Sequence, residues 1–209
     1  HRSMDKLHTY GDDDLSCSIK GVARFRVSIM KQRGSLAAVI RVVHFEIPRP
    51  EDMNIPPEVI RTANLKKGLV LVTGAAGSGK STTLACIIDE INRTRNSHII
   101  TLEDPIEYLH RHNRSVVTQR EIGLDTDSYV NGLVASLRQA PDVILLGEMR
   151  DFDTIKTAMT AAETGHLVIS TLHTIGSANS IDRIIDVFPP DGQQQIRVQL
   201  AMVLQAVIS

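Results

Sequence analysis

The stretch from Gly68 to Thr83 constrains the fold of this chain more than any other. Its sequence, GLVLVTGAAGSGKSTT, begins with apolar residues, half of them β-branched, as is typical of a strand buried on both faces. The glycine-rich turn that follows fits the pattern G-x-x-x-x-G-K-[ST]. Its glycines allow successive backbone N–H groups to point into one concavity at a helix N-terminus, where they can hold phosphate oxygens. The stretch therefore predicts a strand, a phosphate-binding loop and a helix.

Individual residues of the loop have distinct expected roles. Lys80 is expected to reach the β- and γ-phosphates of a nucleoside triphosphate, and the Ser81 hydroxyl is expected to bind Mg²⁺. The alternative is a glycine- and serine-rich turn without a ligand, which the flanking strand and helix disfavour. The predicted nucleotide-binding residues are Gly74, Ala75, Ala76, Gly77, Ser78, Gly79, Lys80, Ser81 and Thr82.

Beyond the loop, apolar stripes at helical spacing alternate with short apolar runs. This alternation predicts an α/β domain over residues 58–209, with a mainly parallel sheet covered by helices on both faces. After the strand that opens the loop, we expect strands at 98–102, 143–146 and 166–172, and helices from residue 80 and at 130–137, 152–164, 178–187 and 191–208.

The first part of the chain has a different pattern. Residues 15–43 alternate at period two, and 46–57 carry four of the eight prolines, as a semi-rigid linker would. We therefore expect a partial small domain at 4–45, the linker at 46–57, and an expression remnant at 1–3. Because no helix stop signal follows the last apolar stripe, we also expect a C-terminal segment to be missing.

Polar residues follow three of the predicted strands. Glu103 and Asp104 end the strand at 98–102, Glu148 follows the strand at 143–146, and His173 follows the last strand. Ligands of open α/β sheets bind at the carboxyl ends of the strands, so we expect these groups to converge beside the loop. A single acidic residue in such a place is usually a helix cap or a solvated charge, but three strand ends together favour function.

These residue types suit transfer of a phosphoryl group to water, which depends on positioning and charge neutralisation. The Glu148 carboxylate could hold Mg²⁺ directly or through water. Glu103 is then available to orient or deprotonate the attacking water, and His173 to bond the γ-phosphate. His166 is a weaker catalytic candidate, since a buried structural histidine is nearly as good an interpretation. Ser81 and Glu148 are the predicted metal ligands.

Three arginines are predicted to share one face of a strand pair. Arg24 and Arg26 lie on the same face of one strand, and a turn at 31–34 leads to a second strand that carries Arg41. A loop of two or four residues would set Arg24 opposite Arg41. Like charges facing each other are unfavourable, so the arginines indicate an anionic partner. The alternatives are a solvated face with splayed side chains, or a three-residue loop that would flip the register.

Composition disfavours several classes of protein. The net charge is −1, and three Tyr, four Phe and no Trp leave little for base stacking, so no nucleic-acid partner is expected. Cys17 and Cys86 form no C-x-x-C pair, which argues against a zinc site or a disulfide framework and favours a reducing, cytoplasmic compartment. No apolar run approaches the length that spans a bilayer.

Several segments, taken with the loop, resemble the secretion ATPase superfamily. In chain order they are ITLEDPIEYLH, QREIGLDTDSY, LRQAPDVILLGEMRD, TAAETGHLVISTLHT and IDRIIDVFPP. They hold an acidic box at Glu103, an atypical Walker B segment that ends in Glu148, and a histidine box with His166 and His173. Residues 147–151, 162–166 and 181–186 are more similar to the pilus retraction branch than to the assembly branch.

The resemblance implies a RecA-like P-loop NTPase core preceded by part of a small α+β PAS-like domain. It further implies an ATP-hydrolysing, Mg²⁺-dependent homohexameric motor that powers type IV pilus retraction and twitching motility. Such a motor acts in the cytoplasm, at the cytoplasmic face of the inner membrane, which it meets through a platform protein. The resemblance implies that Glu103 is the catalytic glutamate and Glu148 the Walker B acid. Arg24, Arg26, Arg33 and Arg41 match the segment whose arginines, in the family, meet a bound nucleotide.

The chain departs from the family pattern at two places, and alternatives stay open. Ala75 and Ala76 replace the usual Pro-Thr of the loop, and Lys67 stands where an arginine is common. The alternatives are a pilus assembly or type II secretion ATPase, or a non-hydrolytic paralogue that modulates a partner ring. A P-loop kinase is the third, although no substrate lid is recognisable.

Overall fold

The structure is a computed structural model that describes residues 5–19, 23–43 and 46–209. Residues 1–3, interpreted above as an expression remnant, lie outside the described residues. The chain divides into two units. One contains the N-terminal strands, and the other contains Ile47–Ile106 and His110–Ser209. Each unit is described by itself below.

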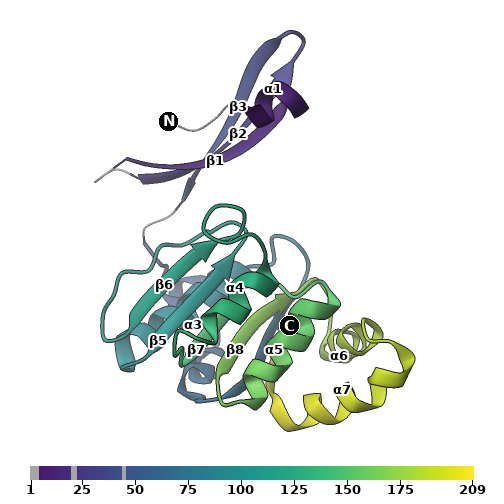
Figure 1. The fold of residues 1–209 in the computed structure, drawn as a ribbon. Helices are drawn as coiled ribbons and strands as arrows, with labels where there is room; N and C mark the ends of the chain where they lie inside the picture. The colour runs from purple at the N-terminus through teal and green to yellow at the C-terminus, as the bar shows by residue number, and fades with distance from the viewer. Residues whose placement is uncertain (1–4, 20–22, 44–45) are drawn as a thin grey trace. The chain divides into compact units, whose positions relative to one another are not determined.

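The N-terminal unit is a three-stranded antiparallel sheet with one short helix, α1, at Asp5–Tyr10 (Figure 1). The period-two pattern of the sequence corresponds to these strands. β2 and β3 are joined by the two-residue turn Arg33-Gly34, whose φ angles are +49° and +80°. Positive φ at both central residues matches the right-handed twist of a hairpin. The strands are β1 (Asp12–Ile19), β2 (Ala23–Gln32) and β3 (Ser35–Val43).

The hairpin register corrects one expectation. Arg26, not Arg24, lies directly opposite Arg41, and Arg24 pairs with Val43. The prediction was wrong because the turn is centred on Arg33-Gly34, which shifts the partner strand by two residues. Since side chains alternate with period two, a shift of two residues keeps all three arginines on one face.

The second unit is a six-stranded sheet in which all neighbouring strands are parallel, in the order β6-β5-β7-β8-β4-β9. Short connecting helices, η1 (Pro50–Met53), α2 (Pro57–Ile60) and η2 (Arg61–Asn64), precede it. The predicted α/β class is confirmed. The strands are β4 (Gly68–Thr73), β5 (His98–Glu103), β6 (Val116–Glu121), β7 (Val143–Leu146), β8 (Leu167–Leu172) and β9 (Leu204–Ile208).

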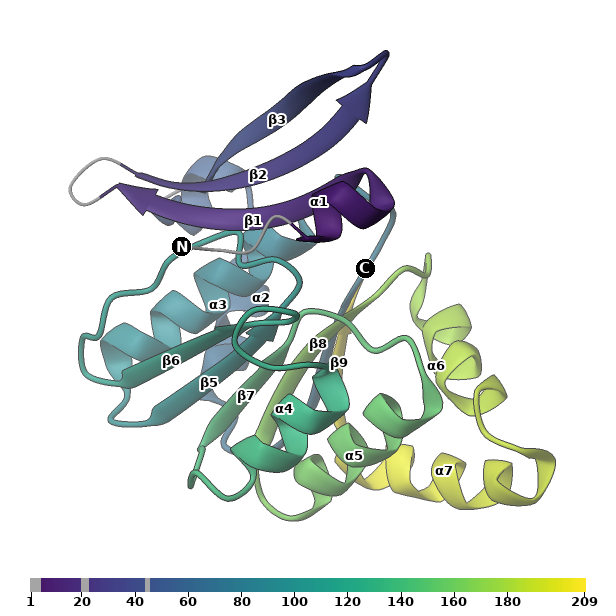
Figure 2. The same cartoon turned by 45° about the horizontal axis from the view of Figure 1, so that its top comes forward.

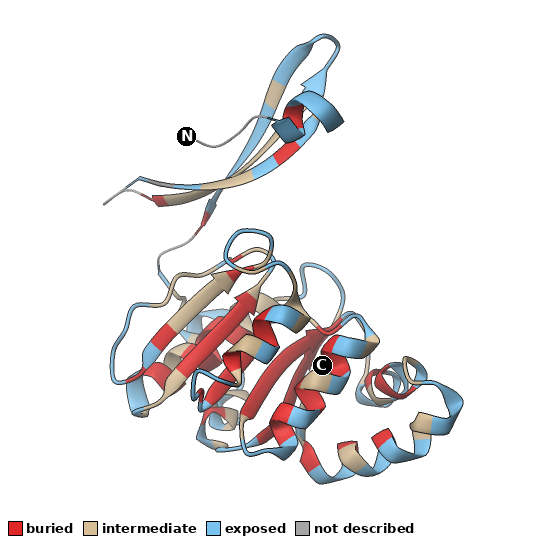
Figure 3. Cartoon of the chain, in the orientation of Figure 1, coloured by how far each residue is buried: buried red, intermediate tan, exposed pale blue. Residues whose placement is uncertain are grey.

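Helices cover both faces of this sheet (Figure 2). One face packs against α3, whose Leu84, Ile87, Ile88 and Ile91 are buried at the predicted helical spacing. The other face packs against α4, α5, α6 and α7. β4, β7 and β8 are buried along their whole length (Figure 3). The helices are α3 (Lys80–Thr94), α4 (Tyr129–Ser136), α5 (Phe152–Glu163), α6 (Ser177–Asp186) and α7 (Pro190–Val203).

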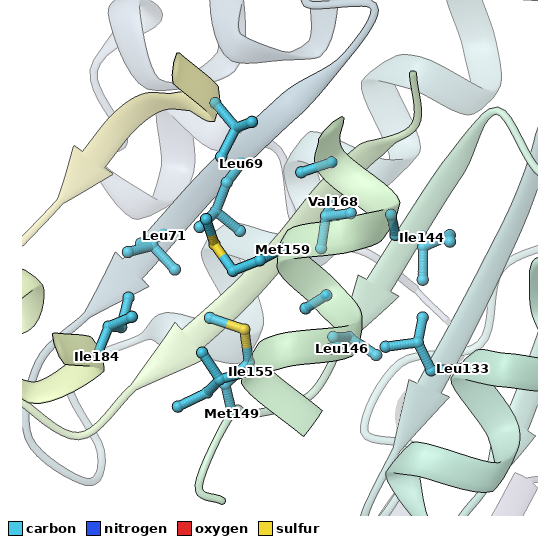
Figure 4. Close-up of a cluster of buried hydrophobic side chains, with 14 of the residues drawn as sticks. Leu69, Leu71, Leu133, Ile144, Leu146, Met149, Ile155, Met159, Val168 and Ile184 are labelled. Carbon is cyan, nitrogen blue, oxygen red and sulfur yellow. The ribbon is translucent and has the colours of Figure 1, made fainter. Parts of the chain in front are cut away.

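The larger apolar cluster lies under α4, α5 and α6 (Figure 4). Leu69 and Leu71 of β4 and Val168 of β8 face Ile155 and Met159 of α5. All five side chains are almost completely inaccessible to solvent. This packing fixes the central strands side by side, and with them the loops at their ends.

Two strands differ from expectation. β6 was not predicted, and the helix expected over 191–208 ends at Val203, where the chain turns into β9. β9 pairs with β4 in parallel, with Val70, Leu71 and Val72 opposite Ala206, Val207 and Ile208. The edge of β4 forms hydrogen bonds with the backbone N–H and C=O groups of residues 204–208. No local sequence pattern indicates that β4 is the pairing partner of this segment.

The two cysteines differ sharply in environment. Cys86 lies on α3, buried, with its Sγ 3.3 Å from the Pro48 carbonyl oxygen, and Cys17 is exposed. Burial, together with the carboxylates of Asp89 and Glu51, raises the pKa of the Cys86 thiol to about 11. Both thiols are free.

This difference predicts selective labelling. At pH 8 only about one Cys86 thiol in a thousand is ionised, and a thiol reagent in solution cannot reach this buried side chain in the folded protein. We expect Ellman's reagent to label Cys17 rapidly and Cys86 only after addition of denaturant. A Cys17→Ser variant should show no fast thiol, and two fast thiols in the native protein would contradict the prediction.

Candidate nucleotide-binding site

The loop between β4 and α3 has the backbone of a phosphate cradle. Gly74, Gly77 and Gly79 have φ angles of +145°, +77° and +91°, which side-chain-bearing residues rarely adopt. At Gly74 a Cβ would also lie 2.6 Å from Ser78 Oγ. Gly79 caps α3 without a side-chain hydrogen bond, so the first N–H groups of the helix face the loop. The geometry suits an anion at the helix N-terminus.

Lys80 bends back over this loop. Its Nζ donates hydrogen bonds to the carbonyl oxygens of Gly74 at 2.9 Å and Ala75 at 2.8 Å. The ammonium group is thereby held beside the turn, where the phosphates of a nucleotide are expected.

The structure brings the predicted strand ends together. β5, β7, β8 and β4 lie in this order in one parallel sheet, so Glu103, Glu148, His173 and the loop occupy the same edge. Glu148 has only 12% of its side chain exposed. Its carboxylate accepts from Arg150 Nε at 2.6 Å and lies 3.4 Å from His173 Nε2. Two strand-end groups are thus in direct contact.

Glu103 is held by donors that the sequence analysis missed. Its Oε1 accepts from Thr101 Oγ1 at 2.6 Å and from Gln119 Nε2 at 3.1 Å. Thr101 stands two residues before Glu103 and therefore on the same face of β5, which alternation could have indicated. Gln119 lies on β6, the strand that was not predicted, so no sequence signal pointed to it.

Tyr129, at the start of α4, is a further residue that the sequence analysis did not single out. Its hydroxyl oxygen lies close to Gly147: a Cβ atom added to Gly147 would be 2.7 Å from this oxygen. Burial, followed by the carboxylates of Glu148, Asp104 and Glu103, raises the pKa of Tyr129 well above its usual value. The phenol therefore stays protonated and can donate a hydrogen bond at the edge where the carboxylates gather.

His166 is not brought to this edge. It precedes β8, whereas His173 follows the strand, so the two histidines lie at opposite ends of it. The Nδ1 atom of His166 is 3.0 Å from the Ala161 carbonyl oxygen and 3.3 Å from Thr164 Oγ1. Within its own chain, His166 therefore contacts the end of α5 and not the residues at the edge that carries the phosphate loop.

Two arginines of the N-terminal unit, Arg26 and Arg41, line a hollow of about 340 Å³. Arg26 and Arg41 contribute to it from opposing strands, together with Asp14, Ser28 and Val39. The Asp14 carboxylate offsets part of the positive charge. Two guanidinium groups at one hollow can hold an anion by paired hydrogen bonds.

Metal binding by protein ligands alone finds no support in the described part of the chain. There, no three His, Cys, Asp or Glu side chains form a group that could hold a metal ion. Proteins usually bind Mg²⁺ through one or two side chains and the phosphates of a substrate. Ser81 and Glu148, the predicted metal ligands, carry oxygen atoms of the kind that Mg²⁺ prefers. Over the same described residues, the structure contains no helix that is both long and apolar enough to cross a bilayer.

Comparison with known proteins identifies the family. A family model described as type II/IV secretion system protein matches residues 12–209. The chain belongs to this family. The resemblance to secretion ATPases drawn from the sequence motifs is therefore confirmed.

Individual members of the family are similar over most of the chain. The chain is 46% identical over 198 residues to the type IV pilus retraction ATPase PilT of Pseudomonas aeruginosa, covering 95% of this chain and 58% of that protein. It is 48% identical over 196 residues to a twitching motility protein of Neisseria gonorrhoeae, covering 94% and 52%. A crystal structure of the pilus retraction motor PilT with bound ADP matches with a TM-score of 0.94 and 50% identity, covering 97% of this chain and 59% of that one. The chain thus spans 52% to 59% of the length of these relatives.

Proposed function

We propose that this chain is the nucleotide-hydrolysing part of an Mg²⁺-dependent ATPase that works as a homohexameric motor in type IV pilus retraction. The observation that carries the proposal is the meeting of the phosphate loop, Glu103, Glu148 and His173 at one edge of the sheet. Retraction ATPases and the twitching motility protein match 94% to 97% of this chain, whereas the type II secretion proteins compared with it match at most 84% of it at similar identity, which favours retraction.

Each side chain of the site has a role in this proposal. The loop N–H groups and Lys80 bind the phosphates, and Ser81 and Glu148 hold Mg²⁺. When bound, Mg²⁺ neutralises charge on the phosphate oxygens. Glu103 accepts a proton from the attacking water as a general base, and hydrogen bonds from Thr101 and Gln119 hold its carboxylate in place. His173, in contact with Glu148, donates a hydrogen bond to the γ-phosphate.

The sheet face that carries Arg24, Arg26 and Arg41, called the arginine face below, completes the nucleotide site of a neighbouring subunit in this proposal. Two arginines that face each other gain stability from an anion between them, since their mutual repulsion is then offset. Arg24, Arg26 and Arg41 share the face that would meet the nucleotide. The ring works at the cytoplasmic face of the inner membrane, where a platform protein receives the motion.

Mixing two inactive variants tests both the activity and the shared site. We expect Lys80→Ala subunits and Arg24→Ala/Arg26→Ala subunits to be nearly inactive alone and to regain Mg²⁺-dependent phosphate release when assembled together. In a randomly mixed ring about one interface in four has an intact Lys80 facing an intact arginine pair, so recovery should approach a quarter of wild-type activity.

Two results would count against the proposal in different ways. No recovery in the mixture would contradict a site shared between subunits. A wild-type turnover no higher than that of the Lys80→Ala protein would contradict the ATPase activity itself.

A further inference from the structure

We propose that Gln119 and Thr101 are positioning residues that orient the Glu103 carboxylate for attack of water on the γ-phosphate. This inference rests on the proposed function, in which Glu103 is the general base. It extends that proposal to two side chains on neighbouring strands, β5 and β6.

The sheet register places both donors beside the carboxylate. Thr101 and Gln119 are direct partners across the parallel pair, and Glu103 follows Thr101 by two residues on the same face. Their hydrogen bonds, at 2.6 Å and 3.1 Å, end on the same oxygen, Oε1. Thr101 is only 1% exposed, so little water competes for its hydroxyl.

The Gln119 amide is itself held in one orientation. Its Oε1 accepts from the His110 backbone N–H at 2.8 Å, while its Nε2 donates to Glu103. Turning the amide by 180° would set its oxygen against the carboxylate and its NH₂ against an N–H group, and both bonds would be lost. His110 N, Gln119 and Glu103 therefore form a directed chain of hydrogen bonds that runs from a loop to the site.

Two donors on one oxygen restrict the rotation of the carboxylate. The terminal torsion of a glutamate side chain is otherwise broad, so a free Glu103 would sample many planes. A general base has to meet its proton at hydrogen-bond distance and in line, and small misplacements are costly. Thr101 and Gln119 supply this constraint from the rigid sheet rather than from a loop.

The test uses substitutions that remove a single donor. Gln119→Glu keeps the acceptor for His110 N, removes the Nε2 donor and places a second negative charge beside Glu103, so its effect is compared with that of an uncharged substitution at Thr101. Thr101→Val keeps the shape and removes the hydroxyl. We expect each to lower kcat for ATP hydrolysis by about tenfold, with KM and ATP affinity changed by less than about twofold. Thr101→Ser, which keeps the hydroxyl, should retain most of the activity.

Thr118→Val provides a matched control. Thr118 neighbours Gln119 on β6, and its hydroxyl lies 3.1 Å from His98 Nε2 instead of reaching Glu103. The same exchange therefore removes a hydroxyl from the same sheet without touching the carboxylate. We expect kcat to stay at the wild-type value.

Combination with Glu103→Gln separates positioning from a merely structural role. If Thr101 and Gln119 act through Glu103, then Thr101→Val and Gln119→Glu should cause no further fall in a Glu103→Gln background. A further tenfold fall in that background would overturn the inference. So would wild-type kcat in the single variants when Glu103→Gln alone is impaired. If Glu103→Gln itself keeps full activity, the base assignment in the proposed function fails, and the positioning role fails with it.

Discussion

Replacing Glu103 with glutamine should lower kcat for ATP hydrolysis by about a hundredfold or more and leave ATP binding nearly unchanged. The amide has the size of the carboxylate, and its oxygen can still accept the hydrogen bond from Thr101 Oγ1. It cannot accept a proton from the attacking water. Steady-state phosphate release, with nucleotide affinity measured by titration with a fluorescent ATP analogue, separates the two effects.

A glutamate outside the site provides the matched control. Glu163, at the end of α5, lies 3.2 Å from Gln199 Nε2 and is exposed. Glu163→Gln makes the same chemical change, and kcat should remain at the wild-type value. If Glu103→Gln were as active as Glu163→Gln, Glu103 would not be the general base.

Replacing Gly68 with alanine should lower the free energy of unfolding by about 2–4 kcal/mol. Gly68 has φ +103°, and a Cβ would lie 2.6 Å from the Val203 carbonyl oxygen and 2.7 Å from Gln205 Cγ. Val203 O belongs to the backbone where α7 meets β9, so relief of the clash requires β9 to move from β4. Urea denaturation followed by circular dichroism measures the change.

Gly165→Ala separates the clash from the backbone conformation. Gly165 has nearly the same φ, +108°, but no atom lies within 4 Å of the Cβ that an alanine would add. The variant should lose only about 1 kcal/mol, the cost of a side chain at positive φ. Equal losses in the two variants would show that the clash with the Val203 carbonyl oxygen adds no cost beyond that of the positive φ angle.

Some residues of the candidate site could be predicted from the sequence, and others could not. The phosphate loop and the acids at the strand ends follow from local patterns, because parallel strands bring their carboxyl ends to one edge whatever the details of packing. The Gln119 donor escaped notice because β6 combines exposed and polar residues and lacks the apolar run of a buried strand. Tyr129 appears in sequence as an ordinary aromatic residue at a helix start. Its place beside Gly147 depends on the packing of α4 against β7 and β5.

The arginine face shows how far pairing arguments extend. Alternation, together with a loop of two or four residues, placed Arg24, Arg26 and Arg41 on one side, and the structure agrees. The directly paired residues are Arg26 and Arg41. The turn consists of Arg33 and Gly34, both with positive φ angles, and so Gln32 pairs with Ser35 and the register follows from there. The period-two alternation decides which face of the sheet a side chain lies on, whereas the position of the turn decides which residues lie opposite each other.

The sequence by itself determined the α/β class, the strand-loop-helix unit at the phosphate loop and the edge of the sheet where its acids meet. These features depend on periodicity and on motifs within about twenty residues. Only the tertiary structure decided that residues 204–208 form a strand and that Thr101 and Gln119 share one oxygen of Glu103. The physical reason is that backbone and side-chain hydrogen bonds between separate strands depend on which segments pair, and the pairing of β4 with β9 joins segments more than 130 residues apart.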